Sequence, residues 1–472
     1  MTFSSIHFLF LFFPITLILY FIIPNRIWRC CVLLLASLIF FGWASPTLLP
    51  LLVAVILFDY LYGLIIGRTI EKGKITASRI HMWTAVCCNI LLLFFYKYLG
   101  LFGESFQQLV QTKLHISEIV MPLGISYFTF TGISYILDIY NGVEKPEKSI
   151  LRFSTYLVMF PKFIQGPITR FKDVKDSLLN PKVKLDDITE GVRRFVIGLA
   201  KKVILADSMA VVANNVFGAD YSTLGAGIAW YGLIAYALQI FFDFSGYTDM
   251  ALGLGRVLGF RLPENFNYPY ISRSIADFWR RWHMSLTAWF RTYLFLPLEF
   301  ARKKEKYFRQ QSNLFIVFLF TGLWHGASWN YVIWGGYFGL ILALESGKFG
   351  KWLKKIPRVF QHVYSLLLIL LGWMFFRINA VGEWGSFIKA LIGVNGWSGT
   401  TTLRSLNVLM FYPIILLAIV FCVPLGKPLK KIYERKPVLT GIVTDIVLAG
   451  VFVLSVTYIL SNGFSSFLYA QF

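Results

Sequence analysis

Two histidines stand in polar and aromatic settings within otherwise apolar parts of the chain. His325 lies in Leu323-Trp-His-Gly-Ala-Ser-Trp-Asn330, and His283 closes Asp277-Phe-Trp-Arg-Arg-Trp-His283. A neutral imidazole, with an unperturbed pKa of about 6.5, is a useful general base. Each histidine also has a purely structural explanation. His325 could be a core residue hydrogen-bonded to a neighbouring helix, and His283 could lie in an interfacial Trp/Arg belt without a function of its own. The presence of both favours a functional pair.

The residues around the histidines indicate a ligand that carries phosphate. Arg280 and Arg281 can make charge-assisted hydrogen bonds to phosphate, and Asp277 can pair with Arg281 at the i,i+4 spacing of a helix. Two histidines without a nearby carboxylate or cysteine set do not favour a metal, and we expect no bound cofactor. The other candidates for binding substrate or donor are Trp282, Trp324, Asn330, Gln165, Asp243 and Tyr247.

The segment from Gln239 to Asp249 supplies two of these candidates, Asp243 and Tyr247. It places carboxylates and hydroxyls after an apolar run, and the end of a helix explains much of that pattern. Downstream, Gly253-Leu-Gly255 resembles a dinucleotide fingerprint only superficially, because no βαβ pattern surrounds it. The chain also lacks a G-x-S-x-G sequence. A serine-hydrolase elbow is therefore not supported.

Composition places these residues in a membrane protein. Of 472 residues, 57% are hydrophobic and only 15% charged, and the mean hydropathy is +0.64. Soluble cores cannot hide so much apolar surface, so we expect an all-α polytopic membrane protein with about ten crossings. The predicted spans are 7–23, 28–44, 47–67, 80–97, 121–140, 224–242, 362–376, 406–423 and 441–460.

The net charge of +21 comes from short basic stretches between the apolar runs. Such stretches mark cytoplasmic loops, so the charge indicates topology and not nucleic-acid binding. Alternation of basic and non-basic loops predicts that both termini lie outside. The basic stretches predicted to be cytoplasmic are 26–29, 68–79, 145–152, 302–309, 348–358 and 427–436.

Three segments do not read as ordinary spans. Residues 154–171 carry prolines, Lys162 and Gln165 within an apolar run, which predicts a re-entrant or protein-buried segment. Residues 186–203 have helical spacing of apolar residues with recurring basic pairs, as in an interfacial helix. Residues 313–345 connect two basic loops, so they must form a hairpin, in which Gly326 breaks the helix and Ser328 and Asn330 cap the next one. His325 would lie about 17 Å from Leu314, near the midplane of a ~30 Å hydrocarbon core.

Together these motifs resemble the membrane-bound O-acyltransferase family, most closely its alginate O-acetylation branch. The resemblance covers nearly the whole chain. It rests on Met121-Pro-Leu-Gly-Ile-Ser-Tyr127, Phe160-Pro-Lys-Phe-Ile-Gln-Gly-Pro167, Phe242-Asp-Phe-Ser-Gly-Tyr-Thr-Asp249, Phe278-Trp-Arg-Arg-Trp-His283, Leu323-Trp-His-Gly-Ala-Ser-Trp-Asn330 and the tail Tyr469-Ala-Gln-Phe472.

The resemblance implies one transmembrane domain over residues 1–472: N-terminal helices in 1–140, a catalytic core in 141–360 and C-terminal helices in 361–472. It implies a ring of helices thinned at the centre into a catalytic funnel, with His325 as the catalytic residue and His283 as a second functional position. The implied activity is O-acetyl transfer from cytoplasmic acetyl-CoA to an extracytoplasmic polysaccharide such as alginate, cellulose or peptidoglycan. The implied location is a bacterial plasma membrane, and the implied partner a secreted SGNH-type acetyltransferase.

Two other functions remain open at this stage. A D-alanyl transfer protein of the teichoic-acid type would take its acyl group from a carrier protein. A transporter or lipid scaffold would use intramembrane histidine and aspartate as a proton relay. Consumption of an acyl thioester separates transfer from transport.

Overall fold

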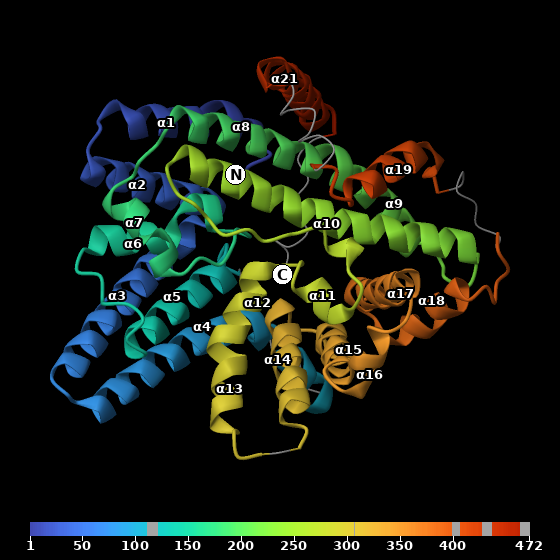
Figure 1. The fold of residues 1–472 in the computed structure, drawn as a ribbon, viewed down its shortest axis with the longest axis horizontal. Helices are drawn as coiled ribbons and strands as arrows, with labels where there is room; N and C mark the ends of the chain where they lie inside the picture. The colour runs from blue at the N-terminus through green and yellow to red at the C-terminus, as the bar shows by residue number, and fades with distance from the viewer. Residues whose placement is uncertain (111–120, 306, 399–405, 427–436, 463–472) are drawn as a thin grey trace. The chain divides into compact units, whose positions relative to one another are not determined.

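The computed structural model describes residues 1–110, 121–305, 307–398, 406–426 and 437–462. Throughout these ranges the chain forms helices and no β-strand, which confirms the predicted all-α fold (Figure 1). Helices satisfy their own backbone hydrogen bonds, as a chain in lipid requires. The tail motif Tyr469–Phe472, and with it the expected position of the carboxyl terminus, lies outside the described residues.

The described chain divides into two compact units. The first contains Met1–Phe195 and Thr248–Glu264, and the second contains Val196–Tyr247 and the described part of Asn265–Leu468. The helices of the first unit are η1 (Phe8–Phe12), α1 (Phe13–Ile22), α2 (Arg26–Ala44), η2 (Pro46–Leu48), α3 (Leu49–Glu71), α4 (Ile75–Val110), α5 (Ile125–Tyr140), α6 (Ile150–Val158), η3 (Phe160–Lys162) and α7 (Phe171–Leu179). Helices α8 (Leu185–Ala200) and α10 (Ala226–Val257) contribute to both units.

The second unit holds the rest of the helices. They are η4 (Lys201–Ala206), α9 (Asp207–Phe217), η5 (Pro269–Ile271), α11 (Ile275–Trp279), α12 (Met284–Phe290), η6 (Arg291–Phe295), α13 (Leu296–Ala301), α14 (Arg309–His325), α15 (Trp329–Glu345), α16 (Lys348–Leu353), α17 (Arg358–Arg377), η7 (Val381–Glu383), α18 (Trp384–Leu391), η8 (Leu409–Phe411), α19 (Tyr412–Phe421) and α21 (Pro437–Asn462).

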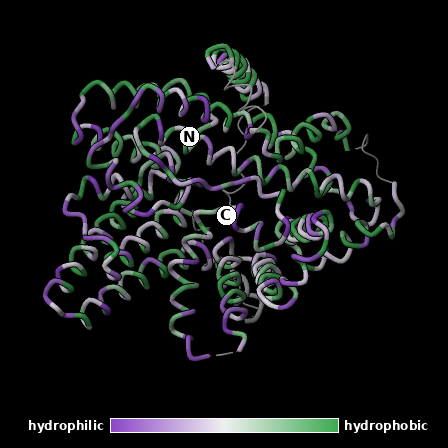
Figure 2. Tube along the Cα trace, in the orientation of Figure 1, coloured by the Kyte–Doolittle hydropathy of each residue, from purple (hydrophilic) through white to green (hydrophobic). Residues whose placement is uncertain are grey.

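Six of the described helices are long and apolar enough to cross a membrane. They coincide with six of the nine predicted spans, and Figure 2 shows hydrophobic residues recurring along the helices. The six segments are Arg26–Ala44, Pro46–Glu71, Ile75–Tyr98, Ala226–Val257, Arg358–Arg377 and Pro437–Ser461. The other three predictions fall on helices that are shorter than expected, at Phe8–Ile22, Ile125–Tyr140 and within Leu409–Phe421. The chain is a multi-pass membrane protein.

The segment 154–171 was predicted to be re-entrant or buried in protein, and the structure shows that it is buried and is not a continuous helix. Helix α6 ends at Val158, η3 follows, and an irregular stretch leads to α7 at Phe171, with residues 153–169 buried. Gly124, which begins α5 with a φ of +70°, lies against the Phe163 carbonyl so closely that a Cβ would overlap it. The glycine of the Met121–Tyr127 motif therefore lets the irregular segment pack against the start of α5.

Residues 313–345 form the predicted hairpin from α14 and α15, and the turn begins directly after His325 (Figure 1). A Cβ on Gly322 would overlap the Tyr331 carbonyl, and one on Gly335 would overlap the Phe318 carbonyl. The two backbones therefore pack against each other without intervening side chains. Gly326 is required by the Tyr331 ring, whose Cε2 would lie 2.5 Å from an added Cβ.

Two expectations about local structure were wrong. Ser328 precedes α15 but its side chain makes no capping hydrogen bond, and Asn330 donates instead to the Phe376 carbonyl at 3.3 Å. The segment 239–249 is not a helix end, because α10 continues through it to Val257. The helix continues because Asp243 is neutralised by a partner from η4, and Gly246 lets the Gly198 carbonyl come within 2.8 Å of its Cβ position.

Candidate active site

His325 is the last residue of α14 and is enclosed by aromatic rings. It is 3% exposed, and its ring packs edge-on against Trp334 at 4.9 Å between centroids and against Phe376 at 5.3 Å. Trp334 comes from α15 and Phe376 from α17, so three helices build the pocket.

His283 is fixed by a different set of contacts. It precedes α12 in the left-handed backbone region, with a φ of 44°, and is 1% exposed. Its Nδ1 lies 3.1 Å from Oδ1 of Asn265, and Phe244 of α10 packs edge-on against its ring at 4.7 Å. A non-glycine residue at positive φ costs energy, and such residues gather at functional sites.

Trp324 connects the two histidines. Its ring centroid lies 4.9 Å from that of His325 and 6.1 Å from that of His283. All three residues belong to the second unit, so the arrangement is internal to one compact body. The structure therefore brings together the two histidines that the sequence singled out, with a predicted tryptophan between them.

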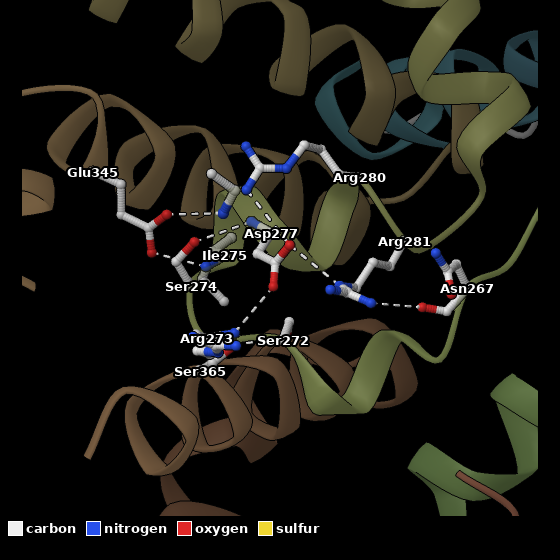
Figure 3. A network of polar contacts seen from close by, with 11 residues as sticks. Asn267, Ser272, Arg273, Ser274, Ile275, Asp277, Arg280, Arg281, Glu345 and Ser365 are labelled. Carbon is white, nitrogen blue, oxygen red and sulfur yellow. Dashed lines mark hydrogen bonds and ion pairs between the residues drawn. The ribbon is translucent and has the colours of Figure 1, made fainter. Parts of the chain in front are cut away.

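The two arginines of the Phe278–His283 motif lie in the polar network of Figure 3. Asp277 holds both, at 3.2 Å from Nε of Arg281 and 3.5 Å from Nη2 of Arg280. The i,i+4 pair of Asp277 and Arg281 is thus confirmed. Arg281 also donates to the Asn267 carbonyl at 3.2 Å and is 27% exposed, whereas the Arg280 side chain is 70% exposed. Arg281 is held by the protein, and Arg280 is the more available to an anion.

Glu345 sets the position of this network. Its carboxylate accepts hydrogen bonds from the backbone of Ile275 and Ala276, both at 2.8 Å, at the start of α11 (Figure 3). Glu345 is the last residue of α15. The hairpin that carries His325 is thereby tied to the short helix that precedes Arg280 and Arg281.

We expect Arg280→Glu to weaken donor binding. Loss of a charge-assisted contact to phosphate, worth ~1.5–3 kcal/mol, should raise the KM for an acyl-CoA donor about tenfold or more while leaving the fold intact. Arg261→Glu is the control, because Arg261 is an 85% exposed arginine in the other unit. Steady-state kinetics on both variants measure the difference. An equal KM for both would place the donor phosphates elsewhere, for example near Arg193, Arg194, Lys201 and Lys202.

Asp243 forms part of a buried ion-pair cluster. Nζ of Lys202 lies 2.8 Å from Oδ1 of Asp243 and 2.8 Å from Oδ1 of Asp207. Burial favours the neutral amine, but the two carboxylates outweigh this effect and the pKa of Lys202 is raised. Lys202 is the second residue of the π-helical segment η4, a form that often occurs at functional sites. Tyr247, one turn after Asp243, is fully buried.

Two other predicted binding residues lie within the aromatic core. Trp282 is 1% exposed and packs among Phe266, Phe278 and Trp373, with centroid distances of 5.1, 5.5 and 4.8 Å. Asn330 is fully buried and joins the start of α15 to the end of α17 through the Phe376 carbonyl. Both support the walls of the histidine site.

Gln165 lies in the first unit, so the structure does not group it with the histidines. It is fully buried, and neither its amide oxygen nor its nitrogen has a hydrogen-bond partner among the described residues. Nearby Lys162 is 4% exposed, lies 4.3 Å above the Tyr156 ring and lines a small cavity with Thr131 and Pro167. The cavity has room for about one water molecule.

Sequence reasoning missed Asn265 and the ion-pair role of Lys202. Asn265 contacts His283 from a loop, and no local pattern distinguishes it from an ordinary turn asparagine. Lys202 was expected on an interfacial helix, and only the buried Asp243 elsewhere in the chain reveals its partner. The sequence did hold one indication of this pair. Asp243 lies in an otherwise apolar run, and a carboxylate buried in such a run needs a cation as its partner.

Comparison with known proteins decides the family. The sequence profile of MBOAT, the membrane-bound O-acyltransferase family, matches residues 147–357. The chain is also 35% identical to a probable alginate O-acetylase of Azotobacter vinelandii, over 100% of both proteins. The chain belongs to the membrane-bound O-acyltransferase family. It is therefore an O-acyltransferase that uses an acyl donor, and the family resemblance expected from the motifs is confirmed.

Other relatives of this membrane-bound O-acyltransferase act on different polymers. A peptidoglycan O-acetyltransferase of Helicobacter pylori is 33% identical over 84% of the chain and 80% of that protein. A teichoic acid D-alanyltransferase of Bacillus subtilis is 34% identical over 54% of the chain and 66% of that protein. The O-acetylating relatives thus match more of the chain than this D-alanylating one.

Proposed function

We propose that this protein transfers acetyl groups from cytoplasmic acetyl-CoA to a hydroxyl on the outer side of a bacterial plasma membrane, for O-acetylation of a polysaccharide. The observation that carries the proposal is the buried pair of His283 and His325, joined through Trp324 inside one unit. Full-length similarity to an alginate O-acetylase supports acetyl as the transferred group. The acceptor is the polymer itself or the hydroxyl of a secreted SGNH-type partner that passes the acetyl on.

The proposed chemistry is a single acyl transfer. The neutral imidazole of His325 takes the proton of the acceptor hydroxyl, and the oxygen attacks the thioester carbonyl. A new C–O ester bond forms, the C–S bond breaks, and the proton passes to the departing thiolate to give free coenzyme A. Burial of His325 at 3% exposure keeps water from competing for the acyl group.

The orientation proposed here follows the basic loops. Arg302 to Arg309 and Lys348 to Arg358 flank the hairpin, and both stretches face the cytoplasm under the positive-inside rule. Exposed Arg280 then meets the coenzyme A phosphates from the cytoplasmic side. The acceptor enters from outside, through the funnel that the family resemblance implies, and both termini face that side.

D-alanyl transfer from a carrier protein is the second candidate. The similarity to a teichoic acid D-alanyltransferase favours it over transport, for which family membership gives no support. The carrier-protein donor would present its phosphopantetheine to the same exposed arginine, so geometry alone does not separate the two donors.

Donor use and sidedness can be tested together in membrane vesicles. Acetyl-CoA with a labelled acetyl group is supplied to inverted and to right-side-out vesicles, with a soluble SGNH-type acceptor or the polymer present on the opposite side. We expect label to move to the acceptor only in inverted vesicles, where the cytoplasmic face is exposed. Transfer from a D-alanyl carrier protein and not from acetyl-CoA would support the second candidate, and use of neither thioester would contradict both.

A further inference from the structure

The environment of His283 determines which of its ring nitrogens carries the proton. Oδ1 of Asn265 accepts a hydrogen bond from the backbone N–H of Ser285 at 3.1 Å and another from the Ser285 hydroxyl at 2.9 Å. A backbone N–H can only donate, so the Asn265 atom that faces it is the carbonyl oxygen and not the amide nitrogen. That oxygen also lies 3.1 Å from Nδ1 of His283.

An amide oxygen cannot donate, so Nδ1 of His283 must carry the hydrogen of this contact. In the neutral ring Nε2 then holds the lone pair. Nε2 is buried and has no hydrogen-bond partner among the described residues. A buried acceptor left open in this way indicates a place where a ligand group donates a hydrogen.

Backbone hydrogen bonds also hold Asn265 next to His283. Met284 N–H donates to the Asn265 carbonyl at 2.9 Å, and Asn267 N–H donates to the Arg281 carbonyl at 2.9 Å. Residues 265–267 are therefore bonded to 281–285 on both sides of His283. The left-handed φ of 44° at His283 is maintained by these contacts.

We propose that Asn265 is a positioning residue that fixes His283 in the Nδ1-protonated form and presents Nε2 as a hydrogen-bond acceptor to the hydroxyl substrate. The inference rests on the proposed acyl transfer and adds to it a defined protonation state at the second histidine. His283 then orients the hydroxyl through this hydrogen bond, while His325, on the other side of Trp324, takes its proton.

Among the described residues packed around His283, Asn265 is the one that lies within hydrogen-bonding distance of its ring, and the others are aromatic. Phe244 of α10 and Trp324 of α14 contribute aromatic rings, and His325 is the titratable group beyond Trp324. On α10 the preceding residue, Asp243, pairs with Lys202. On its own turn Arg281 pairs with Asp277.

Asn265→Asp gives a sharp test, because Nδ2 of Asn265 is buried with no hydrogen-bond partner among the described residues. The substitution keeps an accepting oxygen for all three donors and changes only the charge. A carboxylate at this distance stabilises the imidazolium, so His283 becomes protonated at higher pH. Because transfer requires the neutral ring, we expect the acidic limb of the pH–rate profile to move upward by about one pH unit or more.

Ser285→Ala is the matched control, because it removes one donor to the same oxygen and leaves the oxygen facing His283. Its acidic limb should stay where the wild-type limb lies. An unmoved limb in a folded, active Asn265→Asp protein would overturn the inference while leaving acetyl transfer established. A merely structural role would lower the rate equally at every pH.

The wild-type protein offers a second measurement that does not depend on activity. In protein labelled with ¹⁵N-histidine, nitrogen chemical shifts distinguish a protonated from an unprotonated ring nitrogen, and the His283 signals are assigned by their loss in His283→Asn. We expect a protonated Nδ1 and an unprotonated Nε2. The opposite assignment contradicts the role of Asn265 even if the proposed transfer holds.

Discussion

We expect His325→Ala to abolish acyl transfer, with a rate loss well beyond the ~10²-fold lower limit for general-base catalysis. The ring sits among Trp324, Trp334 and Phe376 with 3% exposure, so water has little access to the site and cannot readily replace the missing base. The measurement is kcat for acetyl transfer by purified protein, with amount and thermal unfolding of each variant checked alongside.

His81→Ala provides the matched control. His81 also packs edge-on against an aromatic ring, that of Tyr62 at 6.3 Å, but belongs to the first unit and to no part of the candidate site. The His81→Ala variant should retain most of the wild-type rate of acetyl transfer. If His325→Ala is well folded and transfers acetyl at a similar rate to His81→Ala, the general base lies elsewhere.

Lys202→Met should cause the largest loss of stability. The substitution removes the ammonium that contacts both Asp243 and Asp207 at 2.8 Å, and it leaves the carboxylate of Asp243 buried. Breaking a buried ion pair by removing one partner costs about 3–5 kcal/mol. Thermal or denaturant unfolding in detergent measures the loss.

Comparison among variants tests the origin of that loss. Asp243→Asn should cost less, because Lys202 keeps Asp207, and combining it with Lys202→Met should recover part of the stability. Lys201→Met is the control at the half-buried neighbouring lysine. Equal destabilisation by Lys201→Met and Lys202→Met would show that the ion-pair cluster is not the cause.

Hydropathy predicted the parts of the fold that depend on lipid. Six spans and the α14–α15 hairpin could be located from sequence because a membrane helix carries its apolar character within one continuous segment. The pairing of Asp277 with Arg281 was accessible for a similar reason, since the two residues are only four positions apart. Both histidines were found from their local setting alone.

The remaining features depend on residues that are distant in the sequence. The aspartate at 243 appeared to close a helix because no nearby cation was available, and its partner Lys202 comes from another element. Asn265 reaches His283 across 18 residues through a loop, and local propensity carries no information about such a contact. The role of Asn330 was misjudged because a polar residue near a helix start usually caps it, whereas here a carbonyl of α17 takes its hydrogen bond.

The close backbone contact within the α14–α15 hairpin has a consequence for how the protein is made. Each helix has 17 residues, or about 25 Å at 1.5 Å per residue, which is short of a ~30 Å hydrocarbon core. Neither is well suited to enter the bilayer alone, and α14 would carry His325 into lipid. Because Gly322 and Gly335 let the two backbones meet, the helices can associate within the protein-conducting channel and leave it as a pair. His325 then reaches the membrane already shielded by its neighbouring helix.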